Sequence, residues 1–106
     1  MIRVVLEHKA KDRQCTLKLI EGIEQVRKEA RRRHGYLDGS TLVDVNNPCH
    51  VVVCSTWETL NDWRAWDNSR IRQEMLPLIE DHLAEPYTAV SITENVIWSN
   101  EIAHVS

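Results

Sequence analysis

The order in which two hydrophobic periods follow each other along the chain constrains its fold more than any other feature. Apolar residues alternate with other residues over 2–8, and then recur at three- and four-residue spacing over 14–34. The first pattern predicts a strand and the second predicts an amphipathic helix. Two strands, two helices and a last strand are then predicted over residues 36–45, 50–57, 59–66, 68–83 and 87–96. The order β-α-β-β-α-β predicts an α+β, ferredoxin-like fold, with an antiparallel sheet and helices on one of its faces.

Turn and capping residues support these boundaries. Gly35 follows a basic run at the end of the first helical pattern, as expected for a helix C-terminus. Residues 46–48 (Asn-Asn-Pro) form a turn signal between two strands, which predicts a hairpin. Thr59 and Asp62 resemble a capping box at the start of the short helix. Pro77 lies inside the next helical pattern and is expected to kink or split that helix.

Length and composition limit the class of protein. The chain has 106 residues, which fit one domain; we expect that domain over 1–96 and a tail over 97–106. The formal net charge of −3 argues against a nucleic-acid module that neutralises phosphates. No apolar run is long enough for a membrane span, and the charged N-terminus does not resemble a signal peptide. Three cysteines at irregular spacing argue against a disulfide framework, so a cytoplasmic location is expected.

Two predicted strands carry apolar residues on both faces. The first has Val5 between the alternating Val4 and Leu6, and the third contains a run of three valines over 51–53. Helices cover one face of a ferredoxin-like sheet, so the second apolar face needs another cover. A second copy of the same sheet supplies that cover by a two-fold symmetric contact. The sequence therefore predicts a homodimer that forms through the open sheet face.

The segment Ser55-Thr56-Trp57-Glu58-Thr59, followed by Trp66 and Ser69, resembles the signature of the antibiotic biosynthesis monooxygenase superfamily. The residues His34-Gly35-Tyr36-Leu37 also resemble the start of this family's second strand. The resemblance covers roughly residues 1–95 and implies a dimeric α/β barrel. It implies several chemistries, among them cofactor-independent quinone-forming oxygenases, haem-degrading oxygenases, small-molecule isomerases and members without known activity.

Three sequence positions disfavour the haem-degrading branch of this family. That branch uses an asparagine late on the first strand, a tryptophan on the short helix and a histidine further along. In this chain Trp66 matches the tryptophan, but Glu7 and Leu76 stand at the other two positions. Without the histidine, the iron lacks a proximal imidazole ligand.

Three of the four tryptophans lie close together, at Trp57, Trp63 and Trp66. In this fold a cavity lies between sheet and helices, and we expect Trp66 to face it. An indole offers a flat apolar wall and one N–H donor, which suits a planar aromatic ligand. Trp57, Trp63, Met75 and Leu76 are further candidates for the substrate-binding wall. The alternative is that these side chains simply fill the core.

A base for cofactor-free oxygenation is expected among three titratable residues. If Glu7 faces the cavity, burial raises its pKa and makes it a useful base. His8 and His50 are alternatives because imidazole accepts protons near neutral pH. Asn61 is a candidate donor to the substrate oxyanion. The cysteines and His50 lack a zinc-binding spacing, so no metal site and no cofactor are expected.

The favoured hypothesis is a cofactor-independent monooxygenase that acts with dioxygen on a planar, electron-rich, hydroquinone-like aromatic. The alternative is a non-catalytic dimer that binds a small ligand or acts in stress. A polar group facing an open pocket favours the enzyme, whereas a pocket closed by Trp66, Met75 and Leu76 favours the alternative. An RNA-binding module of the same topology is disfavoured because the chain has no Phe and no excess of positive charge.

Overall fold

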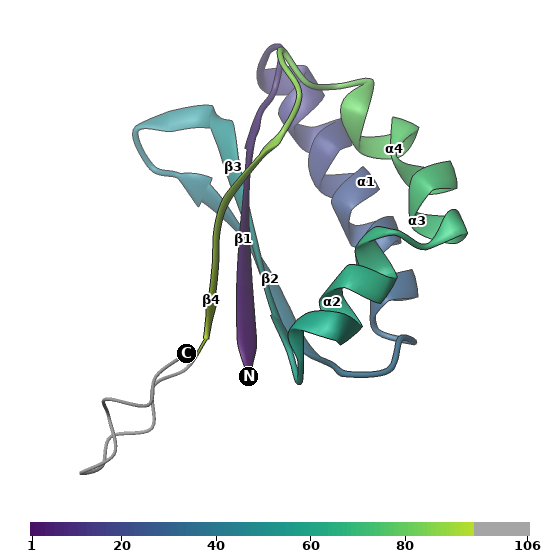
Figure 1. Ribbon diagram of the computed structural model, residues 1–106. Coiled ribbons are helices and arrows are strands. Elements are labelled where there is room, and N and C mark those ends of the chain that lie inside the picture. The colour runs from purple at the N-terminus through teal and green to yellow at the C-terminus, as the bar shows by residue number, and fades with distance from the viewer. Residues whose placement is uncertain (95–106) are drawn as a thin grey trace, which may run out of the picture.

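The computed structural model describes residues 1–94, which form one four-stranded sheet with all helices on one side (Figure 1). The elements in chain order are β1 (Ile2–Lys9), α1 (Arg13–Ala30), β2 (Tyr36–Asp44), β3 (Asn47–Trp57), α2 (Leu60–Asp67), α3 (Arg70–Met75), α4 (Pro77–Glu80) and β4 (Thr88–Glu94). The strands are antiparallel in the order β2-β3-β1-β4. The predicted fold class is confirmed. The end of the last predicted strand and the tail over 97–106 lie outside the described residues.

The register of β1 decides which side chains face the helices. Ile2, Val4, Leu6 and His8 are buried on the helix side, since successive side chains of a strand point to opposite faces. They lie opposite Trp57, Ser55, Val53 and Val51 of β3. Glu7 and the other odd-numbered residues of β1 therefore lie on the face without helices.

The predicted end of the first helix differs from the structure. α1 ends at Ala30 rather than at residue 34, because the next backbone N–H groups bond three residues back, Arg32 to Glu29 and Arg33 to Ala30. This tighter turn leads to Gly35, whose φ of 84° lies in the left-handed region. The predicted break at Pro77 is confirmed, since the helical segment divides into α3 and α4 there.

The predicted cap of α2 is also confirmed. The Thr59 hydroxyl accepts a hydrogen bond from the Asp62 backbone N–H at 3.1 Å. The same hydroxyl donates to the Asp62 carboxylate at 2.8 Å. α3 begins in a similar way, since the Ser69 hydroxyl accepts from the Arg72 backbone N–H. These two caps fix the helices that carry Trp63, Trp66 and Arg72.

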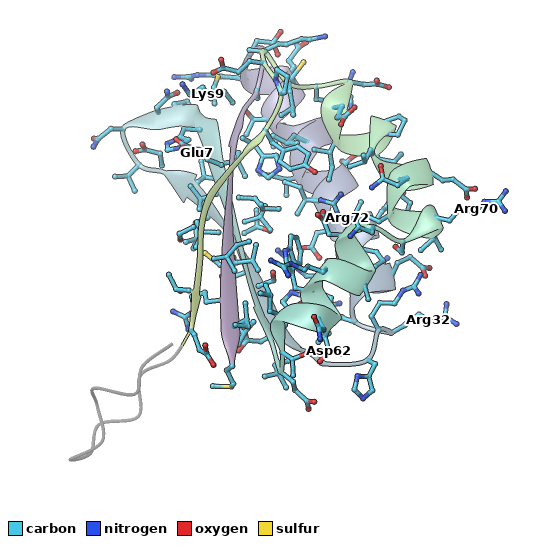
Figure 2. The ribbon with its side chains drawn as sticks, viewed as in Figure 1. Glu7, Lys9, Arg32, Asp62, Arg70 and Arg72 are labelled. Atoms are coloured by element: carbon cyan, nitrogen blue, oxygen red, sulfur yellow. The ribbon has the colours of Figure 1, made fainter. Side chains whose placement is uncertain are left out.

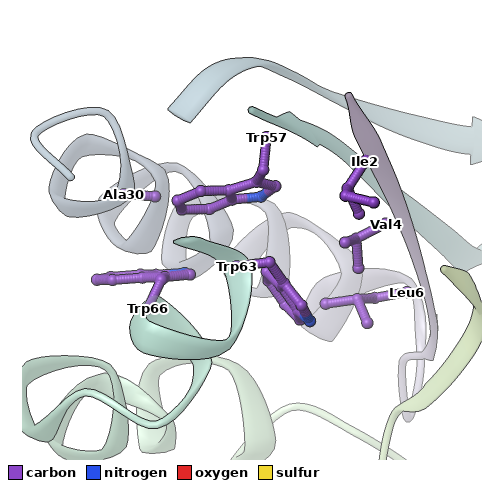
Figure 3. Close-up of a cluster of buried hydrophobic side chains, with 7 residues drawn as sticks. All are labelled: Ile2, Val4, Leu6, Ala30, Trp57, Trp63 and Trp66. Carbon is purple, nitrogen blue, oxygen red and sulfur yellow. The ribbon is translucent and has the colours of Figure 1, made fainter. Parts of the chain in front are cut away.

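The core has two adjoining parts between the sheet and the helices. One is built from Ile2, Val4, Leu6, Ala30, Trp57, Trp63 and Trp66 (Figure 3). The other joins β3, α1 and α4 through residues such as Leu19, Val51 and Ile79. Gly22 allows α4 to approach α1, because a Cβ there would lie 2.1 Å from the Leu78 carbonyl oxygen. Among residues 1–94, no helix is long and apolar enough to cross a membrane.

Candidate functional site

A cavity lies between the helix side of the sheet and the helices, next to the tryptophan cluster. It measures about 60 Å³ as space open to the centres of water molecules. One water needs about 10–15 Å³ by this measure, so the cavity holds several waters or a small organic molecule. The lining side chains come from both layers and are Leu6, His8, Ile23, Val26, Arg27, Ala30, Tyr36, Val53, Cys54, Ser55, Trp57, Trp63, Trp66, Arg72, Ile79 and Tyr87.

Aromatic rings form one side of this cavity. The Trp57 and Trp63 rings meet edge to face, with centroids 5.9 Å apart, and Tyr36 packs edge to face on Trp57 at 5.3 Å. The Trp57 indole N–H donates to the Ser55 hydroxyl at 3.0 Å, which fixes the ring. Trp66 lies beside them, and all three indoles are buried (Figure 3). The wall is therefore aromatic and apolar, and the Trp57 ring is held in place before any ligand binds.

His8 is the buried titratable group of the cavity. Its side chain is 2% exposed, and its ring centroid lies 5.3 Å from that of Tyr87. Burial lowers the pKa of His8 to about 4, and the positive charge of Arg72 acts in the same direction. Backbone hydrogen bonding to Val51 and Leu6 offsets part of this lowering. Within residues 1–94, the buried Nδ1 itself has no partner at full hydrogen-bond geometry. His8 is therefore a neutral imidazole at pH 7 that lines the cavity.

Arg72 brings a buried positive charge to the same cavity. Its side chain is 5% exposed, and Figure 2 shows it on the inner side of α3. One guanidinium nitrogen donates to the Tyr87 hydroxyl at 3.0 Å, and another lies 3.4 Å from an Asp67 carboxylate oxygen. The guanidinium carbon lies 6.0 Å from the Trp63 ring centroid and 5.7 Å from that of Tyr87.

Arg27 of α1 is a second buried cation at the cavity. It pairs with Glu24, and it donates to the Thr41 hydroxyl at 2.8 Å. The contact with Thr41 ties α1 to β2, whereas Glu24 lies on α1 itself. Arg27 thus has one side-chain partner on the helix and one on the sheet, and its structural role is to join the two.

The structure brings together four of the predicted site residues. Trp57, Trp63, Trp66 and His8 all line the cavity. Among the tryptophans, Trp66 has the additional contact of the Arg33 guanidinium, 5.3 Å from its ring centroid.

The other predicted site residues lie away from this cavity. Asn61 is exposed at the start of α2, and Met75 and Leu76 are half-buried at the junction of α3 and α4 without lining the cavity. Glu7 lies on the opposite face of the sheet (Figure 2). The condition under which Glu7 was expected to act, that it faces the cavity, is therefore not met. His50 also lies on that opposite face.

Glu7 and His50 belong to a separate polar cluster on the open face. The Nε2 atom of His50 lies 2.5 Å from the Glu7 carboxylate, and its Nδ1 lies 3.0 Å from the Asp44 carboxylate. The hydrogen bond to Asp44 is the main reason that the pKa of His50 is raised, and the same bond lowers the pKa of Asp44. Asp44 lies two residues after Leu42, which pairs with Val52, so strand alternation places it on the same open face.

Arg27, Arg72 and Tyr87 are cavity residues that the sequence analysis did not single out. A signal existed for Arg27, since it stands between Ile23 and Ala30 in the apolar stripe of α1. A charged residue inside such a stripe is either paired in the core or functional. Arg72 gave a weaker signal because Pro77 interrupts its helical pattern.

No family model matches this sequence, and no curated protein matches it. Solved structures match over almost the whole chain. The structure of an antibiotic biosynthesis monooxygenase has a TM-score of 0.77 at 18% identity, covering 92% of this chain and 100% of that one. SnoaB, a cofactor-independent oxygenase from Streptomyces nogalater, has a TM-score of 0.74 at 7% identity, covering 90% and 95%. A conserved protein from Methanosarcina mazei Go1 has a TM-score of 0.77 at 17% identity, covering 87% and 89%.

These neighbours share the α+β fold of this chain. The chain therefore has the fold of the antibiotic biosynthesis monooxygenases. Fold alone does not determine a reaction. The residues that line the cavity determine which chemistry it can carry out.

Proposed function

We propose that this chain is a small monooxygenase that acts with dioxygen on a planar, electron-rich, hydroquinone-like aromatic, without a resident cofactor. The observation that carries this proposal is the buried, neutral His8, a titratable side chain that lines a cavity walled by tryptophan rings. The similarity in fold to SnoaB, named as a cofactor-independent oxygenase, supports the reaction class.

The walls of the cavity support an aromatic substrate. Trp57, Trp63 and Trp66 offer buried ring surfaces, and a planar ligand gains from stacking and from loss of apolar surface to water. His8 and Arg72 are polar groups that line the same space. Polar groups facing a cavity that Met75 and Leu76 do not close favour an enzyme over a protein with a filled core.

In the proposed reaction, His8 accepts the proton of an aromatic hydroxyl. The anion transfers one electron to dioxygen, and the resulting radical and superoxide combine at a ring carbon that carries hydrogen. The peroxide takes back the proton from His8. Loss of the C–H proton with cleavage of the O–O bond leaves a carbonyl and releases water. One oxygen atom of dioxygen enters the product and the other leaves as water, so one dioxygen oxidises one substrate by four electrons.

The environment of His8 suits the first step in one respect and opposes it in another. Burial keeps the imidazole unprotonated at neutral pH, so the base is available. The same low pKa makes it a weak base in the empty cavity. A phenolate formed beside it favours the imidazolium, because an adjacent opposite charge raises the pKa of a histidine.

We also propose that two chains pair through the open sheet face. Helices cover only one side of the sheet (Figure 1). On the other side Val5, Val52 and Cys54 remain only partly buried in the single chain, and Leu42 is 52% exposed. Sedimentation should give a dimer mass, and Val52→Asp should shift it to the monomer. A wild-type monomer at micromolar concentration would contradict this pairing.

Oxygen uptake by the purified protein tests the proposed reaction. The substrates are a panel of hydroquinones and dihydroxynaphthalenes. The matched variants are His8→Gln and Glu7→Gln, because these neighbours lie on opposite faces of β1. Loss of a general base typically slows turnover about 10²–10⁴-fold. We expect that loss in His8→Gln, and a rate within a few-fold of wild type in Glu7→Gln.

Other outcomes of the uptake assay have distinct meanings. Equal loss in both variants would contradict the assignment of His8. Uptake that neither variant reduces would remove the cavity from the reaction. No uptake over the whole panel, together with binding of the same compounds, would favour the non-catalytic ligand-binding dimer.

A further inference from the structure

Arg72 has more hydrogen-bonding capacity than its neighbours use. A guanidinium carries five N–H donors. Within residues 1–94, its side chain makes one hydrogen bond, to the Tyr87 hydroxyl, and one ion pair, with Asp67 at 3.4 Å. The side chain is nevertheless 5% exposed, so water has little access to the remaining donors. A ligand in the cavity, which Arg72 lines, is the natural partner for them.

The charge of Arg72 is only partly neutralised by protein. Its carboxylate partner Asp67 is 41% exposed, so solvent screens this ion pair. Tyr87 and Trp63 contribute aromatic faces and one neutral hydroxyl. Burying a charge is costly unless it is paired. An anion in the cavity would supply the missing partner, and it would be held in a site of low dielectric constant.

Tyr87 contacts both Arg72 and His8, so it links these two polar side chains. Its hydroxyl oxygen accepts from Arg72, which leaves the hydroxyl proton free to be donated to an acceptor. Its ring packs against His8 on the other side, with a centroid separation of 5.3 Å. Arg72, Tyr87 and His8 therefore form a continuous polar part of the cavity lining, next to the Trp63 ring.

We propose that Arg72, with Tyr87, binds an anionic oxygen of the aromatic ligand, so that the substrates are hydroxyaromatics that carry a carboxylate or are bound as phenolates. This inference deepens the proposed oxygenase function and uses the same cavity. Its test measures binding alone. A failure of oxygen uptake therefore does not affect it.

The first test compares two ligands of the same shape that differ in charge. Isothermal titration calorimetry measures the binding of 2-naphthoate and of 2-naphthamide to the wild-type protein at neutral pH. A hydrogen bond to a charged group is stronger than one between neutral groups, so we expect the carboxylate to bind about tenfold more tightly or better. This comparison uses the wild-type protein only, so it does not depend on whether a variant folds.

The second test locates that preference with a matched pair on α3. Arg72→Gln removes the buried charge. Arg70→Gln removes an arginine of the same helix whose side chain is 92% exposed and bonds Glu74 (Figure 2). We expect Arg72→Gln to abolish the preference and Arg70→Gln to retain it. Arg72→Lys, which keeps a positive charge at this place, should restore part of the preference if Arg72→Gln folds poorly.

A third arm distinguishes the source of the anion. The absorbance of bound 2-naphthol shows whether it is present as naphtholate at a pH where the free compound is neutral. Preference for naphthoate identifies a carboxylate, and ionised bound naphthol identifies a phenolate. The inference is overturned if naphthoate and naphthamide bind equally and bound naphthol stays neutral. It is also overturned if Arg70→Gln removes the preference as fully as Arg72→Gln.

Discussion

The buried His8 makes the stability of the fold depend on pH in a defined direction. The pKa of His8 is lowered from 6.5 to about 4, so between these values the unfolded chain binds a proton that the folded chain does not. Stability therefore rises with pH across this window and is lost on acidification. For this pair of values, linkage gives a loss of about 2 kcal/mol between pH 7 and pH 5.

The variant His8→Gln isolates this contribution because glutamine does not titrate. Urea denaturation followed by tryptophan fluorescence gives the free energy of unfolding of both proteins at pH 7, 6 and 5. Other groups titrate in the same range, but they do so in both proteins and cancel in the difference. We expect the wild type to lose about 2 kcal/mol more than the variant between pH 7 and pH 5. Equal losses would refute the argument that His8 is buried and neutral.

Three further predictions concern the scaffold and the open face. Gly35→Ala should lower the free energy of unfolding by about 1–2 kcal/mol in urea denaturation, because φ at this position is 84°. Trp57→Ala, at a side chain 1% exposed, should cost about 3–5 kcal/mol in the same assay. In NMR titrations, Asp44→Asn should lower the pKa of His50 more than Glu7→Gln does, since the bond to Asp44 is its largest cause. Because that pKa is raised, the stability from His50 is present below about pH 6.5 and is lost as pH rises past the raised pKa.

The periodic segments explain why much of the fold could be predicted. Alternation in β1 and helical spacing in α1 are strong patterns, because each element buries one face against the other layer. The cap at Thr59 and the break at Pro77 depend on local chemistry, and both were predicted. The end of α1 was placed too late because a basic run at a C-terminus fits both helix and tight turn.

The candidate site was harder to predict because it depends on strand parity and on long-range contacts. Glu7 and His8 are neighbours in sequence, and a one-residue difference moves a side chain to the other face of the sheet. The three consecutive valines over 51–53 show no alternation between apolar and polar residues, so they do not indicate which face of β3 is buried. The contact between Arg72 and Tyr87 joins residues 15 positions apart, and no local sequence pattern predicts it.

The most direct test of the central claim, that a ligand binds and loses its proton at the cavity beside His8, is nitrogen-15 NMR of the histidine rings. Spectra are recorded at neutral pH without dioxygen, before and after saturation with 2-naphthol. We expect the ring nitrogens of His8 to show a neutral imidazole in the free protein and to shift towards imidazolium in the complex. The signals of His50, on the opposite face of the sheet, should not move. Unchanged His8 signals at saturation, or a shift confined to His50, would contradict the claim.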